Sequence, residues 1–305
     1  MLALSRRDVL ELLPLSDCIA AVERAFRLHA EQQTFGPGVL GVSAGAGSVH
    51  VKVAGLRGER SYVAAKVNAN FPDNPRRHGL PTIQGTVMLA DAETGRPLAV
   101  MDSASVTALR TGAATAVAAK FLARRDARTA TIVGCGAQGE TQLAALAAVL
   151  PLQRAWVLDS DHARAEAFAA RAATDLGFAV EAAKDLHSAV RGTDVCVTCT
   201  PARRAFLGIA DVAPVASATL VVDVLEQCAE IGELQHALAA GLLTREGVHA
   251  ELGDVVTGRR PGRTRDDEIT IFDSSGTALQ DVAAAVVVYE SARATGRGTE
   301  VRLDD

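Results

Sequence analysis

The sequence predicts an α/β protein that combines a doubly wound parallel sheet with an α+β domain formed by both ends of the chain. Three observations carry this prediction. An apolar run at residues 130–133 leads into three closely spaced glycines, β-runs alternate with helical segments from residue 129 onward, and successive β-runs joined by turns precede residue 103. Strand–helix alternation is the pattern of parallel sheets, whereas β-runs joined by short turns form antiparallel ones.

The residues before 103 predict the α+β domain. Helices are expected at 5–13 and 15–31, the second because apolar residues from Leu15 to Phe26 recur at helical spacing. Five β-runs follow, separated by turn-forming residues, at 39–42, 48–53, 62–67, 85–90 and 97–101.

Two helices connect this domain to the rest of the chain. Residues 102–105 supply helix caps, and a helix is expected from there to about Arg124. Residues 278–292 predict one more helix, which we expect to return to the first domain.

The glycine-rich turn 134–139, GCGAQG, is the most informative motif. It follows a strand at 129–133, precedes a helix at 140–150, and is followed by a second strand that ends in Asp159. This is the context of a Rossmann-type dinucleotide site, in which glycines let the backbone turn tightly and approach a pyrophosphate. The plain alternative is an ordinary glycine turn between a buried strand and a helix.

Asp159 bears on the choice of cofactor. A carboxylate at this position accepts hydrogen bonds from the ribose hydroxyls and repels a 2′-phosphate, so it favours NAD. NADP is the alternative, because Arg164 and His162 follow closely.

The remaining alternation extends the parallel sheet. A helix is expected over 159–176, with strands at 178–181, 194–200 and 219–223. We therefore place the dinucleotide-binding domain at residues 119–277 and the other domain at 1–118 and 278–305.

Composition limits the classes of partner. A chain of 305 residues with 49% hydrophobic residues can form two cores. A net charge of −5 argues against nucleic acid. Four arginines between 259 and 265 mark either a solvated loop, which we favour, or an anion site. No apolar stretch reaches the length of a signal core or membrane span, so we expect no membrane partner and a cytoplasmic protein.

Cys196 and Cys199 form a C-x-x-C, but both lie in the strand expected at 194–200. Positions three apart on a strand point to opposite faces, so this pair does not predict a metal or redox site.

Two cationic residues are candidates for a substrate site. Lys66 ends an apolar run before the irregular segment 68–75, where it is either a snorkelling edge residue or a substrate-facing ammonium able to move a proton. Arg110 comes early in the helix 102–124, where the guanidinium and the positive helix end can bind a carboxylate together. The alternative for Arg110 is a surface salt bridge.

At these residues the chain resembles the ornithine cyclodeaminase and mu-crystallin family. The resemblance covers most of the chain and rests on Lys66 with its loop and on the stretches 79–82, 89–95, 109–114, 134–138 and 274–281. It implies a homodimer built from the first domain, a nicotinamide cofactor between the domains, and a small amino or imino acid stacked on that cofactor.

The resemblance also implies roles for individual residues. Lys66 and Arg110 would bind the substrate carboxylate, Lys66 would also be the candidate catalytic acid/base, and Thr82 would lie beside them. The residues implied to bind the cofactor are Gly134, Gly136, Ala137, Gln138, Gly139 and Asp159 for the adenosine and pyrophosphate half, and Thr200, Ser274 and Gly276 for the nicotinamide end.

The chain departs from the family in two places. Family members usually have a Pro-Arg pair before the first strands, whereas this chain has Pro37-Gly38. His50 and Lys52 are the candidate substitutes, because both lie on one face of a strand while the valines at 49, 51 and 53 would pack inward. The alternative is that His50 and Lys52 face solvent or a neighbouring subunit.

The second departure concerns a strand. Between Thr200 and Thr219 the family normally has a buried strand ending in Gly-x-Asp, whose aspartate is the catalytic acid/base. Here 211–214 runs directly into 215–219. Either the protein has lost the strand, or the molecule contains a segment that this sequence does not include. Asp223 ends a different strand, so the role is not transferred to it.

The sequence thus predicts an NAD(P)-dependent enzyme acting at Cα of a small amino or cyclic imino acid. Ornithine cyclodeamination, oxidative deamination of an amino acid and reduction of a cyclic ketimine all remain open. The alternative is a non-catalytic protein that binds NAD(P) and a small ligand, as the resemblance to mu-crystallin allows. A 2-hydroxy acid dehydrogenase is disfavoured, because no histidine with a partnering acid follows the fourth parallel strand.

Overall fold

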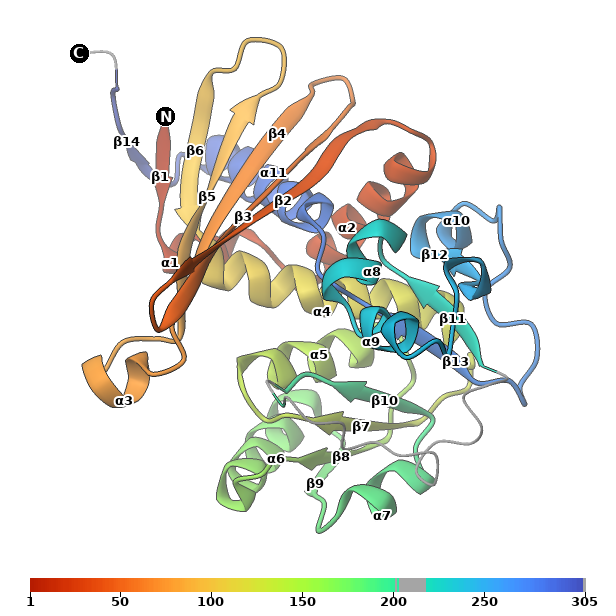
Figure 1. Cartoon of the computed structure of the whole chain (residues 1–305). Coiled ribbons are helices and arrows are strands. Elements are labelled where there is room, and N and C mark those ends of the chain that lie inside the picture. The colour runs from red at the N-terminus through yellow and green to blue at the C-terminus, as the bar shows by residue number, and fades with distance from the viewer. Residues whose placement is uncertain (201, 203–217, 304–305) are drawn as a thin grey trace. The chain divides into compact units, whose positions relative to one another are not determined.

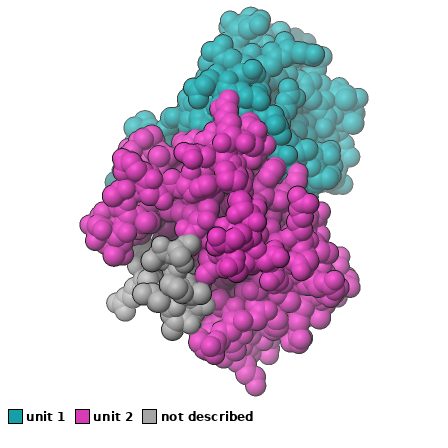
Figure 2. Space-filling model, turned by 90° about the vertical axis from the view of Figure 1, so that its right-hand side faces the viewer, with its two compact units in different colours: residues 1–110, 276–305 teal, residues 111–275 magenta. Residues whose placement is uncertain are grey.

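The computed structural model of the chain describes residues 1–200, 202 and 218–303. The chain divides into two compact units, residues 1–110 with 276–305 and residues 111–275 (Figure 2). Unit 1 and unit 2 meet in sequence inside helix α4 (Ser103–Leu122). The boundary at residue 118 that we placed from the sequence also lies within this helix.

Unit 1 is built on a seven-stranded sheet (Figure 1). Its strands are β1 (Leu2–Leu4), β2 (Thr34–Ala44), β3 (Gly47–Leu56), β4 (Tyr62–Asn70), β5 (Ile83–Asp91), β6 (Pro97–Asp102) and β14 (Thr299–Glu300). The strand order is β14-β1-β6-β5-β4-β3-β2, and every pair is antiparallel except β1 with β6. The five predicted β-runs are confirmed as β2–β6. The short strands β1 and β14 were missed, because two or three residues hold no alternation.

Helices cover one face of this sheet. They are α1 (Arg6–Leu12), α2 (Leu15–Ala30), the first part of α4, and α11 (Ala278–Thr295), whereas the short helix α3 (Asn74–His78) lies in the connection between β4 and β5, beyond the end of the sheet (Figure 1). Helix α11 packs on β3, β4 and β5 and against α2 (Figure 1). It is buried on nearly all sides, as expected for a helix enclosed between a sheet and another helix. The predicted return of the C-terminal helix to the first domain is therefore confirmed, and the core of unit 1 lies between the sheet and α11.

The other face of the sheet is apolar and exposed, and it corrects one prediction. The valines at 49, 51 and 53 were expected to pack inward, yet they lie on this face, and Val53 is 38% exposed. Alternation determines that Lys52 and these valines point to opposite sides, but not which side receives the helix. Helix α11 covers the side of Ala54 and Ala64, whose small side chains are buried. We call the uncovered side the open sheet face, defined by Leu40, Val42, Val53, Val67 and Met88.

Unit 2 contains two parallel sheets. Its strands are β7 (Thr129–Val133), β8 (Arg154–Leu158), β9 (Ala179–Ala182), β10 (Val195–Thr198), β11 (Thr219–Val222), β12 (Ala250–Glu251) and β13 (Thr270–Asp273). The first sheet has the order β10-β7-β8-β9, which is that of a Rossmann half, and the second has the order β12-β11-β13. The predicted Rossmann-type parallel strands are thus confirmed.

Helices of unit 2 alternate with these strands. They are α5 (Ala137–Ala147), α6 (His162–Leu176), α7 (Leu186–Arg191), α8 (Leu225–Ile231), α9 (Leu234–Ala239) and α10 (Leu252–Val256), with a 3₁₀ turn at Arg245–Gly247. The core beside the four-stranded sheet joins Ile132 and Val157 to Leu143, Leu146 and Phe168, all fully buried. In the described part of the chain, no helix has the length and apolar character needed to cross a membrane.

The two sheets of unit 2 are separate in the described residues. Strand β10 pairs with β7 there, and β11 lies between β12 and β13. The segment 211–219, where the sequence departs from the family pattern, lies outside the described residues up to 217. Among the described residues, the parallel strands of unit 2 thus form one sheet that includes β10 and another that includes β11.

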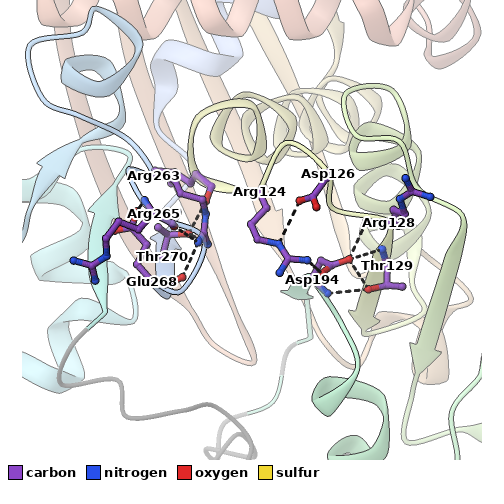
Figure 3. Close-up of polar contacts among 10 residues, drawn as sticks. Arg124, Asp126, Arg128, Thr129, Asp194, Arg263, Arg265, Glu268 and Thr270 are labelled. Carbon is purple, nitrogen blue, oxygen red and sulfur yellow. Dashed lines mark hydrogen bonds and ion pairs between the residues drawn. The ribbon is translucent and has the colours of Figure 1, made fainter.

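Polar contacts fix the C-terminal end of α4 within unit 2 (Figure 3). Arg263 donates from its backbone N–H to the Phe121 carbonyl at 2.9 Å and from Nε to the Leu122 carbonyl at 2.7 Å. These carbonyls end a helix and lack partners within it. Arg265, by contrast, pairs with Asp267 at 2.9 Å on the surface. Arg263 therefore has a structural role, and the solvated-loop interpretation suits Arg265.

We expect Arg263→Ala to lower the free energy of unfolding by about 1–3 kcal/mol, because it removes the charged side-chain donors to the partly buried Leu122 and Glu268 carbonyls. The control Arg265→Ala removes a side chain that is 70% exposed and should change stability by less than about 0.5 kcal/mol. Urea unfolding followed by circular dichroism measures both. Equal losses would contradict the capping role of Arg263.

Candidate functional site

The glycine-rich turn of unit 2 has the backbone geometry of a phosphate cradle. Gly134 has φ +112°, and a Cβ there would lie 2.7 Å from the Cys199 carbonyl oxygen. A Cβ on Gly139 would lie 2.2 Å from the Gly134 oxygen, so this glycine permits close packing of α5 on β7. A Cβ on Gly136 would meet no described atom within 4 Å. Along the chain the three glycines are thus tight, open and close-packed, which is the order a dinucleotide site requires.

The first turn of α5 opens at this cradle. Gly136 is the N-cap residue and has no side chain to bond the first helical N–H groups. Such groups, together with the positive end of the helix dipole, bind phosphate. The buried Oε1 of Gln138 also has no hydrogen-bond partner among the described residues. These residues fit the pyrophosphate of a dinucleotide.

Asp159 follows β8 directly and lies beside the turn. Its Oδ2 accepts the Cys135 N–H at 2.9 Å and its Oδ1 accepts the Asp161 N–H at 3.0 Å. Burial alone would raise the pKa of Asp159, but these hydrogen bonds and Arg164 hold the pKa below its usual value. A charged carboxylate beside the turn suits two ribose hydroxyls.

The loop after β13 is held by Asp223, at the end of β11. Asp223 is 1% exposed, and its carboxylate accepts the hydroxyls of Ser275 at 2.7 Å and Ser274 at 3.3 Å, together with the Val224 N–H. This explains why Asp223 is a poor replacement for the missing aspartate, since its oxygens are already engaged. No pattern in the sequence predicts this structural role.

Thr200 lies against the glycine turn. Its backbone nitrogen is 3.3 Å from the position of a Cβ on Gly134. The strand before it is shorter than predicted: β10 ends at Thr198, so Cys199 lies just beyond it, where its Sγ donates to the Gly134 carbonyl at 3.4 Å. The residues expected near the nicotinamide end other than Gly276 thus all lie in unit 2.

Unit 1 contains a buried cluster of three charges. Lys66 on β4, Arg110 on α4 and Asp281 on α11 are 3%, 5% and 1% exposed. Lys66 Nζ lies 2.8 Å from Asp281 Oδ1 and 2.7 Å from Oδ2, and Arg110 Nε lies 2.9 Å from Oδ1. The two predicted substrate-binding cations therefore meet on one carboxylate. Neither the snorkelling interpretation of Lys66 nor the surface salt bridge of Arg110 describes them.

The surroundings of Lys66 change its protonation. Burial lowers the pKa of Lys66 to about 7, the neighbouring Arg110 and Lys52 act in the same direction, and Asp281 opposes them. An amine with a pKa near neutrality can both hold and release a proton at physiological pH, as a general acid/base must.

Lys66 was expected at the end of its strand, and this is wrong. Strand β4 continues to Asn70, because Asn68 and Asn70 pair with both β3 and β5. The polar residues of the expected loop are therefore partly strand residues, and Lys66 lies well inside the sheet.

The other residues predicted near the substrate differ in how directly they contact this cluster. Lys52 is the cross-strand neighbour of Lys66, and its Nζ donates to the Gly276 carbonyl at 2.7 Å. Gly276 has φ +74°, and a Cβ there would lie 2.8 Å from Arg110 Nη1. His50 is exposed and contacts the Ser48 hydroxyl at 2.9 Å. The Thr82 carbonyl accepts the Phe71 N–H at 2.8 Å. The expected position of Thr82 beside the two cations stays a prediction.

Two residues of this cluster were missed. Asp281 holds both cations, and Gln280 Oε1 accepts a hydrogen bond from Arg110 Nη1 at 2.7 Å. A signal existed, because they are adjacent polar residues at the start of an otherwise apolar helix and lie in the stretch 274–281. Polar residues on a buried helix face require partners.

Comparisons with known proteins agree with this geometry. The family model described as ornithine cyclodeaminase/mu-crystallin family matches residues 1–216 and 210–296. Alanine dehydrogenase from Archaeoglobus fulgidus is 35% identical over 323 residues, with 99% of this chain and 98% of the relative covered.

Two solved structures are similar over their whole length. An archaeal alanine dehydrogenase dimer with bound NAD has a TM-score of 0.94 and 35% identity, with 99% of each chain covered. Delta(1)-pyrroline-2-carboxylate reductase from Thermococcus litoralis, in complex with NADH and L-proline, has a TM-score of 0.94 and 32% identity, with 99% of this chain and 100% of that chain covered.

The comparisons also bear on the missing strand. The alignment with alanine dehydrogenase spans 323 positions, although this chain has 305 residues. The family model matches in two segments that meet at 210–216, where the Gly-x-Asp strand is absent from the sequence.

The glycine geometry predicts opposite effects for two matched substitutions. Gly139→Ala should lower the free energy of unfolding by about 1–3 kcal/mol, because its Cβ cannot fit against the Gly134 oxygen. Gly136→Ala should cost less than about 1 kcal/mol in stability, yet weaken dinucleotide binding about tenfold, because its Cβ enters the cradle. Thermal unfolding and fluorescence titration with NADH measure the two effects. Unchanged dinucleotide affinity in folded Gly136→Ala would contradict the assignment of the cradle.

Proposed function

The chain belongs to the ornithine cyclodeaminase/mu-crystallin family, and we propose that it is an NAD-dependent oxidoreductase acting at Cα of a small amino or imino acid. The observation that carries this proposal is the meeting of Lys66 and Arg110 on a carboxylate in the interior of unit 1. Alanine and pyrroline-2-carboxylate, which the relatives' names specify, both have a carboxylate on the reacting carbon. A pair of buried cations is the chemistry that such a substrate requires.

Each residue of the cluster has a defined task in this proposal. Arg110 and Lys66 bind the two oxygens of the substrate carboxylate and thereby fix the position of Cα. Lys66 in addition gives a proton to the substrate nitrogen or takes one from it. NAD, when bound, supplies the hydride chemistry.

The geometry of unit 2 supports NAD as the cofactor. Gly134, Gly136 and Gly139 supply the backbone cradle, and the charged Asp159 supplies acceptors for the ribose hydroxyls. A carboxylate at this position repels the 2′-phosphate of NADP. Arg164, 3.6 Å from Asp159, keeps NADP as the alternative cofactor.

Three reactions belong to the proposed class. Reduction of a cyclic ketimine, oxidative deamination and cyclodeamination share one hydride transfer at Cα. In ketimine reduction the imine carbon accepts the hydride, whereas in the other two reactions the amino acid gives up the hydride and the resulting imine is attacked, by water in oxidative deamination and by the substrate's own side-chain amine in cyclodeamination. The names of the relatives, a dehydrogenase and a reductase, favour the first two for this chain.

A second candidate function is supported by one observation. The Gly-x-Asp aspartate, the family's acid/base, is absent from the sequence, and the family model matches in two segments around that place. A non-catalytic protein that binds NAD(P) and a small ligand would need the cradle and the cations but no such aspartate. Turnover separates the two candidates.

We also propose a homodimer that forms through the open sheet face. This face exposes Leu40 by 62% and Val42 by 54%, next to Val67 and Met88. Contiguous exposed apolar residues of this kind mark an interface in a soluble protein. The similar archaeal alanine dehydrogenase is described as a dimer. The cytoplasmic location expected from the sequence stays a prediction.

The proposed function is tested by following cofactor absorbance with purified protein, NAD(H), and a panel of small amino acids and cyclic imines. In the direction of imine reduction we expect kcat/KM to fall as pH rises through about 7, because Lys66 must be protonated both to bind the substrate carboxylate and to give a proton to the substrate nitrogen. Lys66→Met should lower kcat/KM by about 10²–10⁴-fold. The exposed Lys184→Met serves as control and should leave it unchanged.

The negative outcomes of this test are distinct. Binding of NADH without turnover of any substrate supports the non-catalytic candidate. A protein that binds neither NADH nor NADPH would contradict both candidate functions. Turnover that survives Lys66→Met would remove Lys66 from the proposed mechanism.

The dimer is tested by light scattering after gel filtration. We expect a dimer for the unmodified chain and a monomer for Leu40→Glu with Val42→Glu, because charges on a buried apolar interface cannot be solvated. Leu242→Glu, at a residue that is 78% exposed in unit 2, is the control and should leave the dimer intact. A dimer that persists in the double variant would exclude this face as the interface.

A further inference from the structure

We propose that Asp281 is a positioning residue that holds the proton on Lys66 and keeps the Lys66 and Arg110 side chains together before substrate arrives. This inference rests on the proposed function, in which Lys66 binds the substrate carboxylate and exchanges a proton with the substrate nitrogen. It assigns Asp281 no contact with the substrate. The residue acts through Lys66 and Arg110.

The contacts of Asp281 support this role. Both of its oxygens lie within 2.8 Å of Lys66 Nζ, and Oδ1 also lies 2.9 Å from Arg110 Nε. The far end of Arg110 is fixed separately, because its Nη1 donates to Gln280 Oε1 at 2.7 Å. Adjacent residues of one helix therefore hold both cations.

The position of Asp281 on α11 makes it a rigid partner. It lies in the first turn, after the N-cap Thr277, where the helix dipole favours a negative charge. Leu279 and Val282 on either side of it are fully buried. Because α11 packs against the sheet and α2, and Asp281 is 1% exposed, the carboxylate is held in the interior of unit 1.

The groups facing Lys66 come from three packed elements. Arg110 faces it from α4 and Lys52 from β3, and both are cations that disfavour a proton on Lys66. Asp281 faces it from α11 and is the one carboxylate among these groups. Thr107 adds an uncharged hydroxyl at 3.4 Å.

It follows that Asp281 decides the charge of Lys66. Burial and two like charges favour the neutral amine, and a carboxylate in contact favours the ammonium. Without Asp281, two buried cations would face each other without a counterion, a situation that proteins relieve by releasing a proton. Lys66, whose pKa is already near neutrality, is the group that would release it.

The test observes Lys66 directly. The lysines of the chain are Lys52, Lys66, Lys120 and Lys184, so protein with ¹³C-labelled lysine gives few side-chain signals, and Lys66→Met assigns the one of interest. In the unmodified protein we expect a titration midpoint at about 7. In Asp281→Asn, which keeps the shape but not the charge, the midpoint should fall by about one pH unit or more.

Matched variants guard this result. Asp175→Asn removes an exposed carboxylate on α6 and should leave the Lys66 midpoint unchanged. If Asp281→Asn alone does not fold, Arg110→Gln and the double variant Arg110→Gln with Asp281→Asn replace the comparison, because they contain fewer unpaired cations. The proposal would be overturned if the Lys66 midpoint were the same in the unmodified protein and in Asp281→Asn. If Asp281→Asn does not fold, an equal midpoint in Arg110→Gln and in the double variant would overturn it.

Kinetics distinguish positioning from a merely structural role. The descending limb of kcat/KM against pH should move to lower pH in Asp281→Asn, with a loss of about tenfold above the limb and little loss below it. Asp281→Glu retains the charge and should keep the limb near its original place. A structural role would lower kcat/KM equally at every pH. If the unmodified protein shows no turnover, the proposed function fails, and the lysine titration still decides the role of Asp281.

Discussion

The buried contact of Lys66 and Arg110 with Asp281 is the constraint on which unit 1 depends. It joins β4, α4 and α11, which lie far apart in the sequence, at one carboxylate. Burial of three charges costs free energy that an apolar core of the same volume would not, so the cluster is weak evidence for stability. Its retention in the interior is instead what the proposed carboxylate-binding function requires, and the C-terminal helix supplies its acidic member.

Unit 2 meets its functional requirement mainly through the backbone. A Cβ would clash at Gly134 and Gly139 but would meet no described atom at Gly136, and these three environments define the shape of the cradle. Side chains then hold the surrounding loops: Asp159 holds the glycine-rich turn, and Asp223 holds the loop after β13 through Ser275. Backbone recognition of phosphate tolerates change elsewhere, which agrees with whole-length similarity to NAD-bound proteins at about one third identity.

The lack of a Gly-x-Asp pattern between Thr200 and Thr219 has a chemical consequence. The resemblance to the family assigns the catalytic acid/base to the aspartate of that pattern, and this sequence does not contain it. Within the described residues, the proton chemistry proposed here therefore falls to Lys66, whose surroundings bring its pKa near neutrality. The charge balance around Lys66 consequently matters more in this chain than the carboxylate contacts alone suggest.

The sequence by itself determined what depends on neighbouring residues: the glycine turn with Asp159, the strands β2–β11 and the long helices, because spacing and turn chemistry are local. It also identified Lys66 and Arg110 as the cations of interest. Only the tertiary structure decided that α11 covers the face of Ala54 and Ala64 rather than that of the valines, since alternation is symmetric with respect to the two faces of a strand. The tertiary structure likewise decided that Asp281 is the partner of both cations, because a buried charge acquires its partner through contacts between segments that are remote in the chain.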